Sequence, residues 1–342
     1  MPPDLWTLYA HMLKSRLFEE AIAKLWHDGL ISGEMHLGTG EEGIIAGIVT
    51  QLREGDALSL DHRGTAALLM RGVDPVLILR ELLGHPEGLC GGRGGHMHLF
   101  SKEHIAVSSG IVGAEGPTAA GFGLSAQYLH PGSIAVAFFG EGAMNQGMLM
   151  ESMNLSSAWT LPVLFVCKDD GWSVTTRSEG VTGGDLNERA RGFGIPAVEV
   201  DGRDVSGVWE AAQTAIERAR SGLGPTFLHA RCVHFEGHFL GFQMIRIVRH
   251  PLREMPGIAL RLTQSFLAPG GAPLRERLAA VKTVLGSVLS TLRDPRRDSA
   301  NDPVRHTNTA LQSDPVRLQE LENRVEKEIS NVLASALAEG PI

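Results

Sequence analysis

Two short segments of the chain combine glycine, carboxylate and amine groups that could hold a metal ion and a phosphorylated ligand. Residues 140–142 (GEG) follow one run of apolar residues, and residues 168–170 (KDD) follow the next. Mg²⁺ prefers carboxylate oxygens and completes its octahedral shell with phosphate oxygens. Glycines beside Glu141 let a phosphate approach the backbone, and a helix predicted after Gly142 would direct N–H groups toward it. The residues therefore predict a magnesium–diphosphate site in which Glu141 and Asp170 share one cation.

The GEG segment has two further interpretations. Its residues also suit a tight strand-to-helix turn followed by a solvated acidic turn, and this alternative stays open at this point. A dinucleotide-binding loop is disfavoured, because Asn145 stands where the third glycine of the GxGxxG pattern should fall. An NAD-dependent enzyme is therefore the weaker hypothesis.

The elements around these segments alternate between helices and short apolar strands. Apolar periodicity predicts helices over residues 5–27, 40–52, 117–129, 143–159 and 205–221, and a further helix beginning near Asp74-Pro75. Apolar runs predict strands over residues 133–139, 161–167, 197–200 and 225–233. This alternation is typical of an α/β fold, a parallel sheet with helices on both faces. The carboxyl ends of neighbouring parallel strands meet at one edge, where ligands bind.

The C-terminal part of the chain has a different pattern. It predicts helices over residues 254–266, 274–292 and 318–337, with an exposed polar linker over about 293–317. Leu321, Val325 and Ile329 recur at a spacing of four, so the last helix should dock on the core or on a partner chain. We expect an α/β domain over residues 1–250 and a helical C-terminal extension over 251–342.

Composition excludes several classes of protein. The 342 residues are 43% hydrophobic and carry a net charge of −8, which disfavours binding to nucleic acid. The apolar runs are far shorter than the roughly 20 residues of a membrane-spanning helix, so no membrane association is expected. The first residues lack the pattern of a secretory leader, and the three cysteines form no CxxC pair. We therefore expect a cytoplasmic protein in a reducing compartment.

Six further segments carry a resemblance to a known family. In this order and spacing they resemble the α subunit of the decarboxylating component of 2-oxo acid dehydrogenase complexes, most closely the acetoin and pyruvate type. The segments are MHLGTGEEGIIAG (35–47), DHRG (61–64), GGRGGHMHLF (91–100), GIVGAEGPTAAG (110–121), MESMNLSSAWTLPVLFVC (150–167) and HFEGHF (234–239). The resemblance covers roughly residues 5–240 and again 314–339. It implies the thiamine diphosphate-binding fold, with thiamine diphosphate and Mg²⁺ as cofactors.

The resemblance also implies a set of metal ligands. Glu141 falls at the first ligand, and Trp172 falls where a residue supplies its backbone carbonyl. Asp170 falls where the second ligand is normally asparagine. This departure adds negative charge beside the diphosphate.

The same resemblance implies residues that contact the cofactor. They are Arg63, His62, Gly110, Val112, Gly140, Gly142, Ala143 and Lys168. Among these, Arg63 matches a phosphate-binding arginine. Lys168 falls where the branched-chain members have such an arginine, and could offset part of the charge. His36 matches a histidine near the diphosphate and the substrate channel, and His238 matches a loop histidine near the reactive end of the cofactor. We expect both to be catalytic residues that assist proton movement or hold the active-site loop.

Two histidine-rich segments have alternatives. In HFEGHF, the side chains of His234, Glu236 and His238 could share one face of a strand and ligate a transition metal, but the spacing lacks a third zinc-type ligand. In GGRGGHMHLF, Arg93, His96 and His98 could line an anion channel or belong to a compact surface loop.

The function implied by the resemblance needs a partner. In this family a β subunit supplies the glutamate that activates the cofactor, so we expect a heterotetramer of two α and two β chains. The chemistry would be cleavage of a 2-oxo acid or acyloin with transfer to a lipoyl-bearing acyltransferase. One alternative is a non-oxidative acyloin-forming or decarboxylating enzyme, motivated by the altered loop over residues 240–249. Another is a degenerate structural subunit, motivated by the acidic pair at 169–170.

Overall fold

The computed structural model describes residues 4–241, 272–292 and 298–338, together with scattered positions between 256 and 270. The predicted helix over 254–266 is therefore described only in part, and its described positions are helical. Of the 240–249 loop that motivates the non-oxidative alternative, only Leu240 and Gly241 are described, and residues 242–249 lie outside the described residues. The domain boundary proposed near residue 250 stays a prediction.

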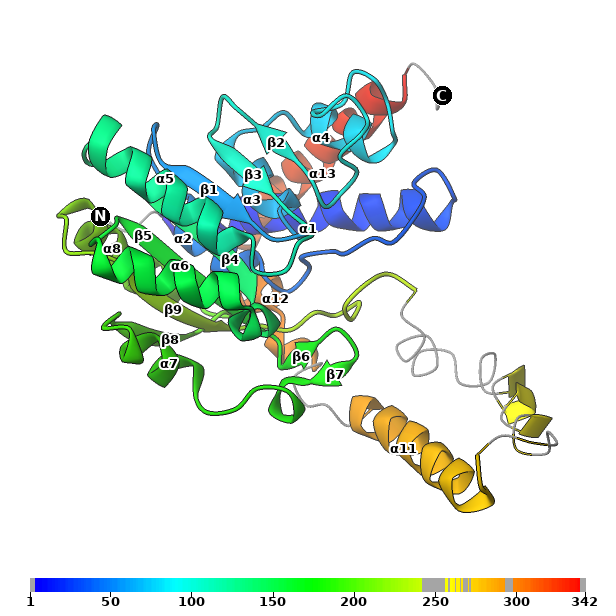
Figure 1. Cartoon of the computed structure of the whole chain (residues 1–342). Coiled ribbons are helices and arrows are strands. Elements are labelled where there is room, and N and C mark those ends of the chain that lie inside the picture. The colour runs from blue at the N-terminus through cyan, green and yellow to red at the C-terminus, as the bar shows by residue number, and fades with distance from the viewer. Residues whose placement is uncertain are drawn as a thin grey trace.

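A seven-stranded sheet forms the centre of the fold (Figure 1). Its strand order is β2-β3-β1-β4-β5-β9-β8, and every neighbouring pair is parallel except β2 with β3. The strands are β1 (Ala57–Leu60), β2 (Phe100–Ser101), β3 (Ala106–Ser108), β4 (Ala135–Gly140), β5 (Val163–Asp169), β8 (Ala197–Asp201) and β9 (Thr226–Arg231). A separate hairpin consists of β6 (Trp172–Ser173) and β7 (Thr176–Arg177). The predicted α/β fold with a mostly parallel sheet is confirmed.

Helices cover both faces of this sheet. Up to residue 220 they are α1 (Leu5–His27), α2 (Glu42–Val49), α3 (Thr65–Arg71), α4 (Pro75–Leu82), α5 (Glu115–Leu129), α6 (Gly147–Ala158), α7 (Leu186–Gly192) and α8 (Val205–Arg220). The later helices are α11 (Leu274–Leu292), α12 (Pro303–Leu311) and α13 (Pro315–Leu337). Short 3₁₀ turns are η1 (Glu141–Asn145), η2 (Ser178–Gly180) and η4 (Ser299–Asn301). Asp4, Asp74 and Asp204 accept backbone N–H groups at the starts of α1, α4 and α8, which explains where these helices begin.

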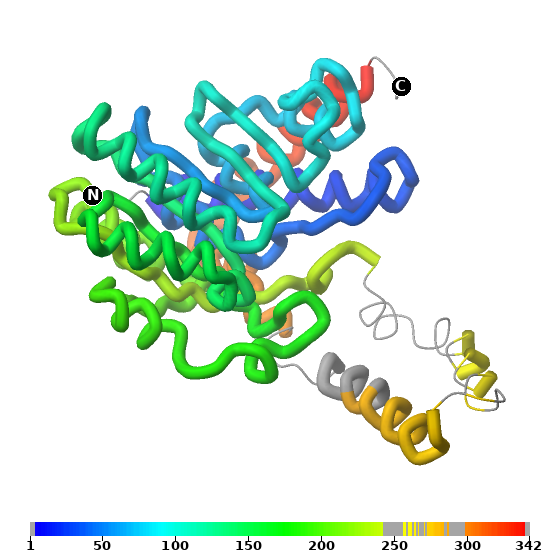
Figure 2. Tube along the Cα trace, in the orientation of Figure 1, coloured from blue at the N-terminus to red at the C-terminus, as the bar shows by residue number. Residues whose placement is uncertain are grey.

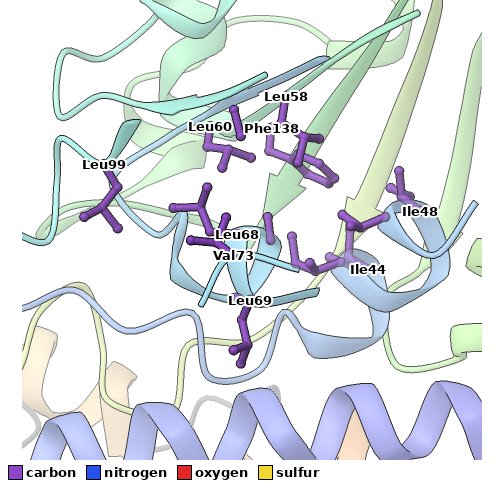
Figure 3. Close-up of a cluster of buried hydrophobic side chains, with 14 of the residues drawn as sticks. Ile44, Ile48, Leu58, Leu60, Leu68, Leu69, Val73, Leu99 and Phe138 are labelled. Carbon is purple, nitrogen blue, oxygen red and sulfur yellow. The ribbon is translucent and has the colours of Figure 1, made fainter. Parts of the chain in front are cut away.

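The strands are apolar throughout because both of their faces are buried. On β4, Val136 and Phe138 join the apolar cluster under α1 to α4 and α8, part of which is drawn in Figure 3. Ala137 and Phe139 point to the opposite face and join the cluster under α5, α6 and α7. Burial on both faces is typical of a parallel sheet and fixes the register of β4 between its neighbours.

The C-terminal helices pack against the N-terminal helix. Figure 2 shows the orange-to-red end of the chain passing behind the blue and cyan segments, and a third apolar cluster joins residues of α1, α12 and α13. The exposed linker predicted over 293–317 is wrong at α12, because Val304, Thr307 and Leu311 are buried there. Arg16 of α1 also binds Asp302, with Nη1 2.9 Å from Oδ2. The prediction that the last helix docks on the core is confirmed.

Replacement of Leu321 by alanine should destabilise the whole chain. Leu321 lies in α13 and is 6% exposed within the cluster that includes α1. Truncation of a buried leucine leaves a cavity and lowers the free energy of unfolding by about 2–5 kcal/mol. Urea unfolding of Leu321→Ala and Val316→Ala gives the comparison, since Val316 lies in the same helix and is 69% exposed. Equal stability of both variants would show that α13 is not part of the core.

Among the described residues, no helix combines the length and apolar character needed to cross a membrane.

Candidate active site

A cavity of ≈ 190 Å³ lies at the carboxyl edge of the sheet, between the ends of β4 and β5. Every predicted site residue except His36 lines it. Those lining residues are His62, Arg63, Gly110, Val112, Gly140, Glu141, Gly142, Ala143, Lys168, Asp170, Trp172 and His238. His36 lies next to this set, with its ring centroid 4.6 Å from that of His62 and 4.9 Å from that of His238.

The parallel pairing of β4 with β5 brings the two acidic segments together. Gly140 lies opposite Lys168 in this pairing, so Glu141 and Asp170 follow at the same edge. The chain after β4 forms the 3₁₀ turn η1, and α6 begins only at Gly147, four residues later than predicted. Glycine is needed at 142, because a Cβ there would lie 2.7 Å from the Ser173 Oγ atom. The prediction that the ends of these two strands lie side by side is confirmed.

Glu141 and Asp170 are two carboxyl groups that share one buried site. Glu141 is 2% exposed and accepts a hydrogen bond from Ser178 Oγ at 2.5 Å. Burial, followed by the charges of Asp170 and Asp169, raises the pKa of Glu141 well above its usual range. Two carboxylates in one buried site repel each other unless a proton or a cation neutralises part of their charge. Their oxygen atoms are the type of ligand that Mg²⁺ prefers.

Asp170 is held by His234, a residue for which the sequence indicated only an unrelated metal site. His234 Nδ1 lies 2.9 Å from Asp170 Oδ2, and Nε2 lies 2.7 Å from Glu41 Oε1. Burial alone would raise the pKa of Asp170, but His234 and Arg63 outweigh it and the pKa is lowered. Asp170 is therefore the ionised member of the acidic pair.

Lys168 is already paired within the protein. Its Nζ atom lies 2.6 Å from Glu41 Oε2 and 3.0 Å from Asp61, and the residue is 1% exposed. The prediction that its charge offsets a diphosphate needs correction, because two buried carboxylates balance that charge first. The only signal for this pairing in the sequence is the presence of Glu41 and Asp61 in two of the family segments.

Arg63 connects two loops at the cavity. Its guanidinium donates to the backbone carbonyl of Leu37 and, at 2.7 Å, to that of His238. The Nε atom lies 4.0 Å from Glu41. Arg63 lines the cavity as predicted, and it also holds the His238 loop against the segment that precedes α2.

The structure agrees neither with the transition-metal site suggested for HFEGHF nor with the anion channel suggested for GGRGGHMHLF. His234 and His238 belong to separate groups of ligand-type side chains, and Glu236 belongs to neither group in the part of the chain that the structure describes. The metal site across His234, Glu236 and His238 is therefore wrong. Arg93 is exposed, whereas His96 is buried against His36. The anion channel that included Arg93 and His98 is not lined as expected, since neither residue lines the cavity.

Glu19 should make the free energy of unfolding fall as pH rises, and replacement by glutamine should reduce this fall. Glu19 lies on α1, and burial followed by the charges of Glu42 and Glu41 raises its pKa to about 8. Between about pH 4.5 and pH 8 the native state holds a proton that the unfolded state has lost, so this group lowers the free energy of unfolding by about 1.4 kcal/mol per pH unit as pH rises. Urea unfolding of Glu19→Gln between pH 5 and pH 8 should show a weaker decline than the wild type.

The control for this prediction is Glu54→Gln, because Glu54 is exposed. This variant should keep the wild-type decline. An unchanged slope in Glu19→Gln would mean that Glu19 is ionised in the native state.

The chain matches the model of the family described as "Dehydrogenase E1 component" over residues 10–241. It belongs to this family. It is 41% identical over 239 residues to the α subunit of acetoin:2,6-dichlorophenolindophenol oxidoreductase of Cupriavidus necator, covering 69% of this chain and 72% of that protein. It is 38% identical over 240 residues to the pyruvate dehydrogenase E1 α subunit of Zymomonas mobilis, covering 69% of this chain and 67% of that protein.

A more distant relative extends the similarity to the C-terminal helices. The mitochondrial pyruvate dehydrogenase E1 α subunit of Dictyostelium discoideum is 30% identical over 340 residues, covering 94% of this chain and 86% of that protein. The recognition from the sequence is confirmed. Membership of the family implies an enzyme component that uses thiamine diphosphate.

The residues of the cavity fit that cofactor when a divalent cation is present. Glu141 and Asp170 provide hard oxygen ligands, and the buried repulsion between them is relieved by a cation. Gly140 and Gly142 expose backbone at the same place, so a phosphate can come close. Without the cation, the negative charge of Asp170 and the neutralised Lys168 would offer a diphosphate little attraction.

Proposed function

We propose that this chain is the α subunit of a thiamine diphosphate-dependent dehydrogenase that cleaves pyruvate-like 2-oxo acids or acetoin. The relatives named as acetoin and pyruvate dehydrogenase α subunits support this substrate range. The observation that carries the proposal is the acidic pair Glu141 and Asp170 in one cavity at the ends of paired strands.

The proposed roles of the residues follow from their positions. Glu141, Asp170 and the Trp172 carbonyl would hold Mg²⁺, and through it the diphosphate. The backbone at Gly140, Gly142 and Ala143 lines the same space, as do Gly110 and Val112, which we assign to the aminopyrimidine ring. Arg63 and His62 border the diphosphate, with Lys168 behind them keeping Glu41 and Asp61 neutralised. Thiamine diphosphate supplies an electron sink for cleavage of a bond beside a carbonyl.

We assign proton handling to His238 and His36. His238 lines the cavity, and burial followed by the charge of Arg63 lowers its pKa to about 4. The same causes lower the pKa of His36 to about 2. Both imidazoles are therefore neutral near pH 7, so each can hydrogen-bond a bound substrate as donor or acceptor while a proton moves.

We further propose that a β subunit completes the site in a heterotetramer of two α and two β chains, and that a lipoyl-bearing acyltransferase accepts the acyl group. The naming of the relatives as α subunits supports a second kind of chain. We place the assembly in the cytoplasm, because free cysteines such as the buried Cys167 suit a reducing compartment.

The test is turnover by the chain purified together with the β subunit encoded nearest to it. Pyruvate and acetoin are supplied in turn with Mg²⁺, thiamine diphosphate and an artificial electron acceptor, and then with a lipoyl domain. Dye reduction and lipoyl acylation with one of these substrates would support the proposal. Carboligation without lipoyl acylation would support the non-oxidative alternative, and no turnover by a folded α–β assembly would contradict both.

A further inference from the structure

Three histidines from separate parts of the chain form a second cluster of metal-ligand type. His36 precedes α2, His62 follows β1, and His238 lies in the loop after β9. One ligand atom from each lies within 4.8 Å of the others. The ring centroids are 4.6 Å apart for His36 and His62, 4.9 Å for His36 and His238, and 5.4 Å for His62 and His238.

His62 has an unused nitrogen inside this cluster. The Nε2 atom of His62 is buried and has no hydrogen-bond partner. A buried polar atom without a partner has lost its hydrogen bonds to water and gained none in the protein, which is unfavourable. A ligand that this nitrogen could bind would remove the cost.

His36 is oriented in the way that metal-binding histidines usually are. Its Nδ1 atom lies 2.8 Å from His96 Nε2, and the two rings are stacked. When Nδ1 donates to His96, the lone pair on Nε2 of His36 is available to a ligand. Metal-binding histidines typically make such a bond through their second nitrogen, which fixes the tautomer and the ring orientation.

The charge around the cluster also suits an imidazole site. Burial, followed by the charge of Arg63, lowers the pKa of all three histidines, so each imidazole is neutral near pH 7 and has a lone pair on one of its two ring nitrogens. Arg63 opposes an incoming cation. Lys168 on the same cavity opposes it too, and the buried carboxylates Glu41, Asp61 and Asp170 offset these two positive charges.

We propose that His36, His62 and His238 bind a divalent transition-metal cation such as Zn²⁺ or Co²⁺. Three imidazoles suit these borderline metals, and Mg²⁺ prefers the oxygen pair of Glu141 and Asp170. Three protein ligands leave a fourth position for water or an anion. Because two of the ligands are the histidines to which we assign proton handling, the metal should inhibit turnover; this consequence rests on the proposed function.

The test is a Co²⁺ titration of the full-length chain after removal of any histidine tag. We expect saturation at one Co²⁺ per chain, with visible d–d absorption bands and no thiolate charge-transfer band in the near ultraviolet. Zn²⁺ should displace Co²⁺, and excess Mg²⁺ should not. His62→Ala and His238→Ala should each weaken Co²⁺ binding at least tenfold, and His130→Ala should leave it unchanged because His130 is exposed.

A second variant excludes the neighbouring group of Glu41, Cys232 and His234, whose ligand atoms also lie within 4.8 Å of one another. A thiolate band that disappears in Cys232→Ser would assign the metal to that group and overturn the proposal. Failure of Co²⁺ to saturate the folded wild type would also overturn it. The spectra do not depend on turnover, so an inactive assembly with the expected bands would contradict the proposed function and leave the metal site standing.

Discussion

Replacement of Lys168 by methionine is expected to lower the free energy of unfolding by about 3–5 kcal/mol, the usual effect of breaking one side of a buried ion pair. The ammonium group is 1% exposed and contacts both Glu41 and Asp61. Methionine has a similar length but no charge, so two buried carboxylates would lose their partner. Urea unfolding at pH 7, followed by circular dichroism, measures the change.

A matched variant separates charge from packing in this experiment. Lys168→Met combined with Glu41→Gln and Asp61→Asn keeps the shapes of all three side chains and removes the unpaired charges. We expect this triple variant to recover most of the lost stability. A loss below about 1 kcal/mol in Lys168→Met alone, the range of an exposed pair, would contradict the buried ion-pair network.

Replacement of Glu141 by glutamine should abolish most of the Mg²⁺-dependent affinity for thiamine diphosphate. The variant keeps the size of the side chain and its contact with Ser178, but it loses the charge that we assign to the metal. Loss of a supporting outer-shell group typically weakens metal affinity 10–100-fold, so loss of a ligand should raise the apparent dissociation constant by about 100-fold or more. Quenching of tryptophan fluorescence can report binding, since Trp172 lines the cavity.

The stability of Glu141→Gln distinguishes a binding defect from misfolding. Glutamine removes the buried repulsion between Glu141 and Asp170, so the variant should be at least as stable as the wild type without cofactor. Glu151→Gln is the matched control, because Glu151 lies on α6 and is exposed. Equal cofactor affinity in Glu141→Gln and Glu151→Gln would contradict the assigned role of Glu141.

The elements that the sequence predicted well carry strong local signals. Helix α1 has the predicted bounds, because its apolar repeat is long and Asp4 caps its start. The central strand β1 was missed: it has only four residues, and its burial comes from pairing with β3 and β4. The polar composition of α12 predicts a linker there. Its position depends on contacts with α1, nearly 300 residues earlier in the chain.

The candidate site, like the fold, was predictable where the strands that carry its residues are recognisable in the sequence. Glu141 and Asp170 follow consecutive strands, so the geometry of a parallel sheet brings them together. The partners of Lys168 are not local, since Glu41 lies 127 residues away and Asp61 lies 107 residues away. No periodicity relates such positions. For the same reason, the sequence suggests a role for His234 only with Glu236 and His238, its neighbours in the chain, and not with Asp170.

The most direct test of the central claim is a calorimetric titration of thiamine diphosphate into the wild-type chain purified with its β subunit. The titration is done with Mg²⁺ and again after the metal is removed with a chelator. We predict saturable micromolar binding that requires Mg²⁺. No binding to the folded assembly at any Mg²⁺ concentration would contradict the assignment of Glu141 and Asp170 and would favour a structural subunit that has lost its cofactor.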